Sequence, residues 1–204
     1  IVGASYGNIL PLMNIGKVSN HGFEFKARYE GKIHDKISYF AEAGTWYAMS
    51  KVKEQGEDIQ AESYLYKKGN PVWKPIVLEA EGFYGVDDFD SNGKLKADLP
   101  QPQFGHVAPG DIKYKDYNGD KIVNENDAHP VGNATVPAWN YMFSGGIKYK
   151  GFDLSVLFQG VAQRDIYLRG ASVYSFQNNG TASNLALDSW TTTNPNASYP
   201  RLST

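Results

Sequence analysis

The residues of this sequence whose types and spacing could do chemistry lie between positions 109 and 127, which read PGDIKYKDYNGDKIVNEND. Oxygen-bearing side chains recur there at alternate positions, which is the ligand spacing of a twelve-residue calcium loop. Hard cations such as Ca²⁺ need several oxygens that converge from a tight turn, and alternate residues of a turning chain can supply them. The predicted ligands of a structural Ca²⁺ are Asp116, Asn118, Asp120, the backbone carbonyl of Ile122, Asn124 and Asp127.

Two positions depart from the calcium-loop pattern. Lys121 stands where such loops carry glycine, and the closing residue Asp127 is shorter than the usual glutamate. The alternative is a surface turn rich in Asn, Asp and Gly that holds no metal, and the spacing alone leaves both interpretations open. A second acidic turn at residues 87–98 repeats only the first half of the pattern, so we expect a solvated turn there.

Four segments of the sequence alternate between two kinds of side chain, which is the period of a β-strand. In the first segment, aromatic residues such as Phe23 alternate with charged residues such as Glu24. A short polar connection at residues 31–35 and a two-residue turn at Lys150-Gly151 join the segments in pairs, which is typical of hairpins. We therefore predict one antiparallel sheet with strands near residues 22–31, 36–50, 139–149 and 152–162.

The rest of the sequence lacks sustained alternation and is rich in Gly, Pro, Asp and Asn. It comprises residues 1–20, 51–138 and 163–204, which we predict to be loops with short elements at 61–67 and 183–190. The acidic stretch lies in the second loop. Aromatic side chains in these loops are expected to pack the loops together; they are Tyr64, Tyr66, Trp73, Phe83, Tyr84 and Trp190.

Composition bounds the possible functions of the 204-residue chain. A net charge of −2 provides no basic field for nucleic acid, and the absence of cysteine excludes thiol catalysis and disulfides. No apolar run is long enough for a transmembrane helix, but a barrel strand needs only about ten residues with an apolar outer face. The side chains predicted to share one lipid-facing side are Phe23, Phe25, Tyr149, Phe152, Leu154, Val156 and Phe158.

No set of residues in the sequence has the arrangement of a catalytic site. The four histidines, His21, His34, His106 and His129, are scattered, and we expect surface or loop positions for them. Carboxylates are numerous, yet nothing in their spacing singles out an acid–base pair. The sequence therefore predicts a protein that is not an enzyme.

Several motifs, taken in order along the chain, resemble one known family. NIGKVSNHGFEF spans residues 14–25, PGDIKYKDYNGD spans 109–120, and YKGFDLSVLFQGVAQRDIY spans 149–167. VGN at 131–133, Gly145-Gly146 and NPNASYPRLS at 194–203 complete the set. In this order the motifs resemble SusC/RagA-type TonB-dependent outer-membrane transporters, with a variable middle from about Lys51 to Pro102.

The resemblance implies an all-β fold in which antiparallel strands form part of the wall of a large transmembrane β-barrel, with long extracellular loops at 51–138 and 163–204. It implies TonB-dependent uptake of glycan or peptide nutrients across the outer membrane of a Gram-negative bacterium of the Bacteroidota type. The implied partners are outer-membrane lipid, a SusD-like lipoprotein lid, and TonB acting through a plug domain that is not in this chain. Because such barrels usually end on an aromatic residue, we expect an interior fragment of the C-terminal barrel region.

In a barrel, aromatic belts would mark the two membrane interfaces. Tyr29, Tyr149 and Phe152 would lie near the periplasmic interface, and Trp46, Tyr47, Trp139 and Tyr141 near the outer one. A soluble antiparallel sheet would show the same alternation, so a calcium-stabilised β-sandwich module that binds glycans is the alternative. A fragment of an extracellular glycan hydrolase is a third hypothesis, but it requires a paired carboxylate site that the sequence does not reveal.

Overall fold

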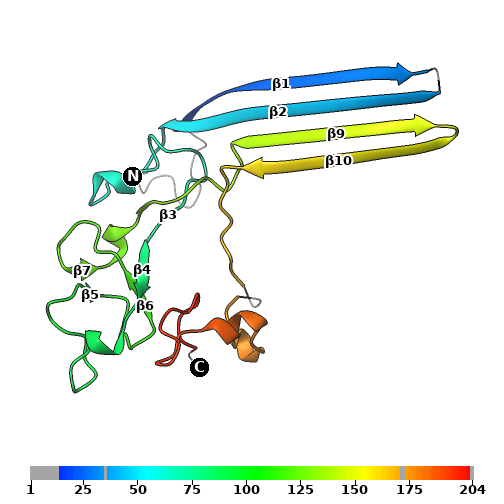
Figure 1. Ribbon diagram of the computed structural model, residues 1–204. Coiled ribbons are helices and arrows are strands. Elements are labelled where there is room, and N and C mark those ends of the chain that lie inside the picture. Colours follow the sequence, from blue (N-terminus) through cyan, green and yellow to red (C-terminus); the bar gives the residue numbers. More distant parts are fainter. Residues whose placement is uncertain (1–13, 35, 171–172, 203–204) are drawn as a thin grey trace. The chain divides into compact units, whose positions relative to one another are not determined.

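The computed structural model describes residues 14–34, 36–170 and 173–202, and it is all-β with a few single-turn 3₁₀ helices. Its largest sheet has four strands in the order β1-β2-β9-β10, and three further sheets have two strands each (Figure 1). The chain divides into two compact units. We call them the strand unit (up to Gln60, then Tyr66–Val72 and Ala138–Ala162) and the loop unit (Ala61–Leu65, Trp73–Pro137 and from Gln163).

The strand unit contains the four strands that alternation predicted, and all neighbours are antiparallel. β9 (Trp139–Tyr149) and β10 (Phe152–Ala162) have the predicted bounds. β1 (Lys17–Ile33) and β2 (Ile37–Glu54) are longer than predicted at the end far from their turn. The prediction of a loop at residues 17–20 was therefore wrong, because Val18 is the single apolar residue there and one residue gives no alternation.

The pairing register places all the predicted apolar side chains on one face of the sheet. Directly opposed residues of neighbouring strands share a face, and Phe25 opposes Thr45, which opposes Tyr141. Tyr149 likewise opposes both Ile37 and Phe152. The prediction that the seven apolar residues share one face is confirmed by this register.

The turn between β9 and β10 explains why this hairpin was predictable to the residue. Lys150 and Gly151 have φ of 46° and 87°, so both central residues lie in the left-handed region. A two-residue turn with two positive φ angles matches the twist of the flanking strands and fixes their register.

The loop unit is built from very short elements around a small core. Tyr84, Phe89 and Leu95 form this core, with Leu99 and Val107 packed against it. The predicted elements at 61–67 and 183–190 are 3₁₀ helices. The loop-unit elements are η2 (Ser63–Leu65), β3 (Ile76–Val77), β4 (Ala80–Phe83), η3 (Val86–Asp88), β5 (Gln101–Pro102), β6 (Ile112–Tyr114), β7 (Ile122–Val123), η4 (Glu125–Asp127), β8 (His129–Pro130), η5 (Gln177–Asn179) and η6 (Asn184–Asp188).

Pairing within the loop unit joins segments far apart in sequence: β3 with β8, β4 with β6, and β5 with β7. Tyr84 and Trp190 are buried, as expected of aromatic residues that pack loops, whereas Trp73 is 72% exposed. In the part of the chain that the structure describes, no helix combines the length and apolarity needed to cross a membrane.

Candidate functional site

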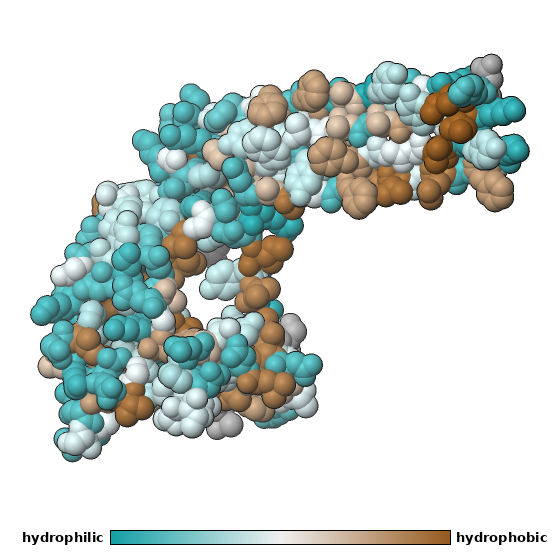
Figure 2. All heavy atoms as spheres, in the orientation of Figure 1, coloured by the Kyte–Doolittle hydropathy of each residue, from teal (hydrophilic) through white to brown (hydrophobic). Residues whose placement is uncertain are grey.

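One face of the four-stranded sheet carries no charged side chain over the eleven-residue band that all four strands share, from Trp139 to Tyr149 on β9. Its side chains are aromatic, aliphatic or glycine apart from one threonine, and most of the large ones are exposed. Figure 2 shows hydrophobic residues along the sheet and a more hydrophilic surface over the long loops. We call this surface the apolar face.

The hydroxyl group of Thr45 on the apolar face is fully used within the sheet. The indole Nε1 of Trp139 donates a hydrogen bond to Thr45 Oγ1 at 2.8 Å, and Thr45 Oγ1 donates to the Asn140 carbonyl at 3.1 Å. A polar group that is paired in this way costs little when water is removed from around it. The apolar face is therefore compatible with an environment that offers no hydrogen bonds.

Aromatic residues concentrate at both ends of the apolar face. At one end, Phe23, Tyr47 and Trp139 form a cluster with ring centroids 5.5–6.0 Å apart. Toward the other end, the ring centroids of Tyr29 and Tyr39 lie 6.0 Å apart, and Tyr149 and Phe152 oppose each other in the last pair. The predicted belt residues Tyr29, Tyr47, Trp139, Tyr141, Tyr149 and Phe152 all lie on this face, whereas Trp46 opposes Glu24 and Asn140 and so lies on the opposite one.

The opposite face of the sheet is polar and carries a charge network. Glu42 contacts Lys26 at 3.0 Å and Arg28 at 2.9 Å, and Arg28 also pairs with Glu30 at 2.6 Å. The Arg28 guanidinium lies 4.3 Å from the centroid of the Phe40 ring. Opposed charges across neighbouring strands stabilise the register, and their concentration on one face indicates that this face is in contact with water.

The acidic loop of the loop unit, residues 116–127, folds by hydrogen bonds from its own backbone. Asp116 accepts from the backbone N–H groups of Gly119 at 2.7 Å and Lys121 at 2.8 Å. Asn118 accepts from Asp120 N–H at 3.0 Å, and Asp120 accepts from Ile122 N–H at 2.7 Å. Each short polar side chain thus closes a turn of the chain, as Asx residues do.

The conformation of this loop explains its glycine and its departure from the usual pattern. Gly119 and Lys121 both have positive φ, at 79° and 64°. Glycine adopts this region readily and lysine does so at a cost, which the bond from Lys121 N–H to Asp116 offsets.

Asp127 lies apart from the turn carboxylates because it is fully buried. Its oxygens accept hydrogen bonds from Tyr117 N–H at 2.9 Å and Asn124 N–H at 2.8 Å, with a longer contact of 3.4 Å from Asn118 N–H. Asn124 in turn accepts from Asn126 N–H at 2.8 Å. A buried carboxylate is tolerated where several backbone donors converge on it, so Asp127 ties the two ends of the acidic loop together.

The six predicted metal ligands therefore belong to one loop, but with different surroundings. Asp116 is half-buried and Asp120 is exposed, while Asp127 is enclosed by backbone donors. Lys121 and Val123 use their carbonyls to pair with β5, so the Ile122 carbonyl between them points to the other side of the chain. Within the described residues, no group of three or more His, Cys, Asp or Glu is arranged to hold a metal. Calcium binding stays a prediction, and it depends mainly on Asp116, Asn118 and Asp120 reorienting toward an ion.

Sequence reasoning missed an aromatic stack that holds the acidic loop. Tyr117 stacks on His129 with ring centroids 3.9 Å apart. The rings of Tyr64 and Tyr117 are close to perpendicular, with centroids 4.8 Å apart. His129 also lies 3.3 Å from Glu79, which pairs with Lys115 at 3.2 Å. The prediction of a surface position for His129 was wrong because its side chain is buried, and no local sequence signal marks its contact with Glu79, 50 residues away.

The ionic state of Glu79 follows from these contacts. The hydrogen bond from Lys115 lowers the pKa of the Glu79 carboxyl below its ordinary value, with smaller contributions from the charge of Lys115 and from His129. Burial raises the pKa of the Tyr64 phenol, whose hydroxyl donates to the Asn126 carbonyl at 2.6 Å.

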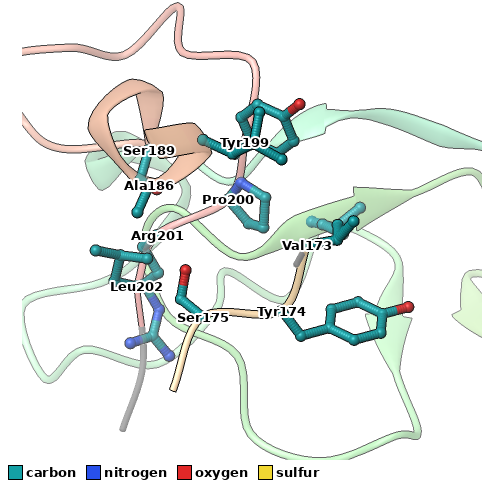
Figure 3. A pocket seen from close by; sticks show the side chains of 11 residues that line it. Val173, Tyr174, Ser175, Ala186, Ser189, Tyr199, Pro200, Arg201 and Leu202 are labelled. Atoms are coloured by element: carbon teal, nitrogen blue, oxygen red, sulfur yellow. The ribbon is translucent and has the colours of Figure 1, made fainter. Parts of the chain in front are cut away.

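The loop unit also contains a cavity of about 330 Å³ (Figure 3). Its lining is mostly apolar, and Arg201 is its charged member. The Arg201 guanidinium is held in place by Asp111, with Nε 2.7 Å from Oδ1. The cavity could take a small apolar group; its lining includes Ile112, Val173, Tyr174, Leu185, Tyr199 and Leu202.

Known proteins resemble this chain in sequence and in fold. No protein-family profile matches the sequence. The chain is 27% identical to TonB-dependent receptor P26 and 21% identical to TonB-dependent receptor P3, both of Formosa agariphila. Each alignment covers 93% of this chain and 19% of the relative, so the chain spans about one fifth of the length of these receptors.

Solved structures show the same fold. All of this chain aligns with 22% of a chain in the structure of the RagAB peptide transporter, with a TM-score of 0.59 and 16% identity. A structure of the RagAB peptide importer in its closed-closed state gives a TM-score of 0.58 and 14% identity. The antiparallel strands therefore have the fold of part of a large transporter barrel, and the resemblance of this chain to the SusC/RagA-like TonB-dependent transporter family is confirmed.

Proposed function

We propose that this chain forms part of the wall and external loops of a TonB-dependent transporter that takes up nutrients across the outer membrane. The observation that carries this proposal is the uncharged apolar face. Its eleven residues span about 33 Å along each strand. At the tilt of about 40° that outer-membrane strands adopt, this corresponds to the apolar band of about 25 Å that such barrels present to lipid.

The ends of the apolar face support the same assignment. An aromatic cluster lies at one end and the pair Tyr149–Phe152 at the other, where girdles flank the lipid-facing band of outer-membrane barrels. The two hairpins have turns of three and two residues at one end and long loops at the other, which matches short periplasmic turns and long external loops. We propose that the loop unit lies outside the cell and that the polar face with Glu42 faces the barrel interior.

The sandwich alternative requires a second sheet over the apolar face. Within the described residues most of the large side chains of that face are exposed, for example Phe158 at 67% and Phe25 at 60%. Soluble proteins rarely expose a contiguous apolar surface of this kind. The exposure therefore favours lipid as the covering phase.

Partners and cargo follow from the relatives and are part of the proposal. The receptors that this chain resembles are named for their dependence on TonB, and RagAB is a peptide transporter. We propose energy input from TonB through a plug domain, a SusD-like lipoprotein lid at the external loops, and glycans or peptides as cargo. A Gram-negative host of the Bacteroidota type belongs to the same proposal.

We also propose that Ca²⁺ stiffens the acidic loop and does no chemistry there. Three carboxylates within one twelve-residue loop repel one another, and a bound cation relieves that repulsion. The turn that Asp116, Asn118 and Asp120 form supports this proposal because it keeps their oxygens in one short loop, from which they would reorient toward the ion.

The test of the transport proposal is a fractionation followed by an uptake assay. We expect the protein to remain with outer membranes after salt and alkaline washes and to enter solution only with detergent. Cells that lack it, or that lack TonB, should lose uptake of the same nutrient. A protein that washes off without detergent would contradict the assignment of the apolar face to lipid.

A further inference from the structure

β1 and β2 continue past the aromatic cluster that ends the apolar face. β9 begins only at Trp139, which opposes Tyr47. β1 and β2 remain paired beyond this point, as far as Lys17 and Glu54. Beyond Tyr47, the next positions on the same face are the pair His21–Met49 and then the pair Ser19–Lys51. The face that carries no charge for eleven residues therefore turns basic directly beyond its aromatic end.

A β-bulge adds a second lysine at this place. The register shifts between Lys17 and Val18, which leaves Lys53 as the extra residue of β2. Lys51 and Lys53 are both exposed, and neither makes an ion pair within the described residues. We call Lys51, Lys53 and His21 the basic ledge.

Hydrogen bonds to a neighbouring segment hold the backbone of β2 at the basic ledge. In the absence of β9 at this level, Val52 bonds instead to Asn70 and Gly69, at 2.9 and 2.8 Å. The Val72 N–H donates to Ser50 Oγ at 3.0 Å. This added segment also brings Lys67 and Lys68 into the strand unit, with their backbone N–H groups bonded to Glu57. Five lysines (Lys17, Lys51, Lys53, Lys67 and Lys68) therefore gather at this end of the strand unit beside the two carboxylates of Glu54 and Glu57.

The height of the ledge matches a lipid headgroup layer. Lys51 follows Tyr47 by four residues, which is about 13 Å along the strand and about 10 Å along the membrane normal at a tilt of about 40°. Headgroups occupy roughly 5–8 Å beyond the hydrocarbon on each side. A lysine side chain reaches back over that distance and keeps its ammonium among phosphates, as snorkelling lysines do.

The other end of the apolar face lacks this arrangement. Its last residues are Ile33, Ile37, Tyr149 and Phe152, and the nearest lysine on the β9–β10 side, Lys150, is in the turn with its ammonium 5.3 Å from the Tyr149 ring centroid. Lys32 and Lys148 near the turns lie on the polar face, so strand-borne lysines on the side of the apolar face occur only beyond its loop end within the described residues, which the proposed orientation places at the outer leaflet.

We propose that the basic ledge binds phosphate groups of anionic lipid headgroups in the leaflet at the loop end. Charge complementarity and direct continuity with the lipid-facing band carry this inference, which rests on the proposed membrane function. The ledge would fix the depth of these strands and recruit phosphorylated lipid to the transporter wall, because basic residues beside a membrane are attracted to anionic lipid.

The experiment uses the full-length, membrane-inserted protein in nanodiscs. One set contains only phosphatidylcholine, and the other adds a bis-phosphorylated glycolipid at one fifth of the lipid. The measurements are the thermal midpoint and the amount of glycolipid that stays with the protein after detergent exchange. The test variant is Lys51→Glu with Lys53→Glu, the conservative variant is Lys51→Arg with Lys53→Arg, and the matched control is Lys94→Glu with Lys113→Glu in the loop unit.

We expect the glycolipid to raise the midpoint of the parent, the arginine variant and the control. In the double glutamate variant the rise should disappear and glycolipid retention should fall roughly ten-fold. Equal retention by the parent and the glutamate variant would overturn the inference. A midpoint shift produced by free phosphate in detergent, without lipid, would also overturn it. A parent that fails to enter nanodiscs at all would contradict the membrane assignment instead.

Discussion

The two units of this chain are held together by different kinds of hydrogen bond. The strand unit has eleven basic and eight acidic residues, and its long strands pair along their whole length. The loop unit has nine basic and fourteen acidic residues, and its strands are two to four residues long. In the strand unit the backbone ladder holds the chain, whereas in the loop unit aspartates do so by accepting hydrogen bonds from nearby N–H groups.

This difference shows what each unit is adapted to contact. Aspartate-to-backbone bonds suit a chain surrounded by water, because the remaining charge stays solvated. Over the eleven-residue band that its four strands share, the strand unit instead carries its charged side chains on one face and none on the other. This division fits the proposed setting, in which one face meets lipid and the other meets water.

The largest expected effect comes from a charge on the apolar face. Val156 lies on that face, and its neighbour Leu157 lies on the polar one. Val156→Arg should lower the free energy of folding into lipid vesicles by about 2–4 kcal/mol, while Leu157→Arg should change it little. Urea titration of the vesicle-inserted protein measures both. Equal costs for the two variants would show that the sheet does not separate lipid from water.

A second contrast concerns glycines that face aromatic rings. A Cβ at Gly160 would overlap the ring of Tyr141 directly opposite, whereas at Gly145 the nearest atom would be 3.5 Å away. Gly160→Ala should therefore destabilise the sheet by about 1–3 kcal/mol, as overpacking does. Gly145→Ala should fall near the parent in the same urea titration. The reverse order would mean that Tyr141 moves aside freely.

In the loop unit, the sharpest test is Asp127, whose buried carboxylate accepts backbone N–H bonds. Asp127→Asn replaces one oxygen by a donor that faces other donors, so about 1–3 kcal/mol should be lost locally. Protease cleavage between residues 116 and 127 should accelerate accordingly. Asp87→Asn, in the second acidic turn, is the matched control because no side-chain hydrogen bond of Asp87 is found within the described residues.

Calcium titration tests the loop unit separately from the strand unit. We expect a heat change when Ca²⁺ is added to the chelated protein, together with slower cleavage of the acidic loop. Asp116→Asn should weaken that response without affecting the strand unit. No heat at millimolar Ca²⁺ would leave a metal-free turn stabilised by its own hydrogen bonds.

The smallest effect is a pH dependence at Asp165. The backbone N–H and side chain of Asn133 both donate to Asp165, which lowers the pKa of its carboxyl below the ordinary value of 3.8. The folded-state pKa is depressed, so this contribution to stability is complete above about pH 4 and is lost as the pH falls through the lowered value. Proteolysis near residue 133 by an acid-stable protease should increase below that pH in the parent. An Asp165→Asn variant should show no such change.

The sequence predicted the strands well because period-two alternation and a two-residue turn are local signals. It failed at the outer ends of β1 and β2, where Lys51 and Ser19 give no contrast between faces. It also failed for the pairing of β4 with β6, since strands of three or four residues joined across nearly 30 positions have no periodicity to detect.

The acidic loop shows a similar limit. Its residues were identified from spacing, but the burial of Asp127 and the stack of Tyr117 on His129 were not. Both depend on chain segments that meet only in three dimensions. Spacing can therefore suggest which ligands a loop offers, while the balance between a metal and internal N–H donors depends on the fold around it.

The order of strands in the sheet bears on how the protein is assembled. β1 and β10 are the outermost strands of the described sheet, so each has one side with unpaired peptide groups. Hydrocarbon offers these groups no partner, and each one left open there costs several kcal/mol. In the proposed barrel, the two hairpins should accordingly enter the bilayer together with the strands that flank them.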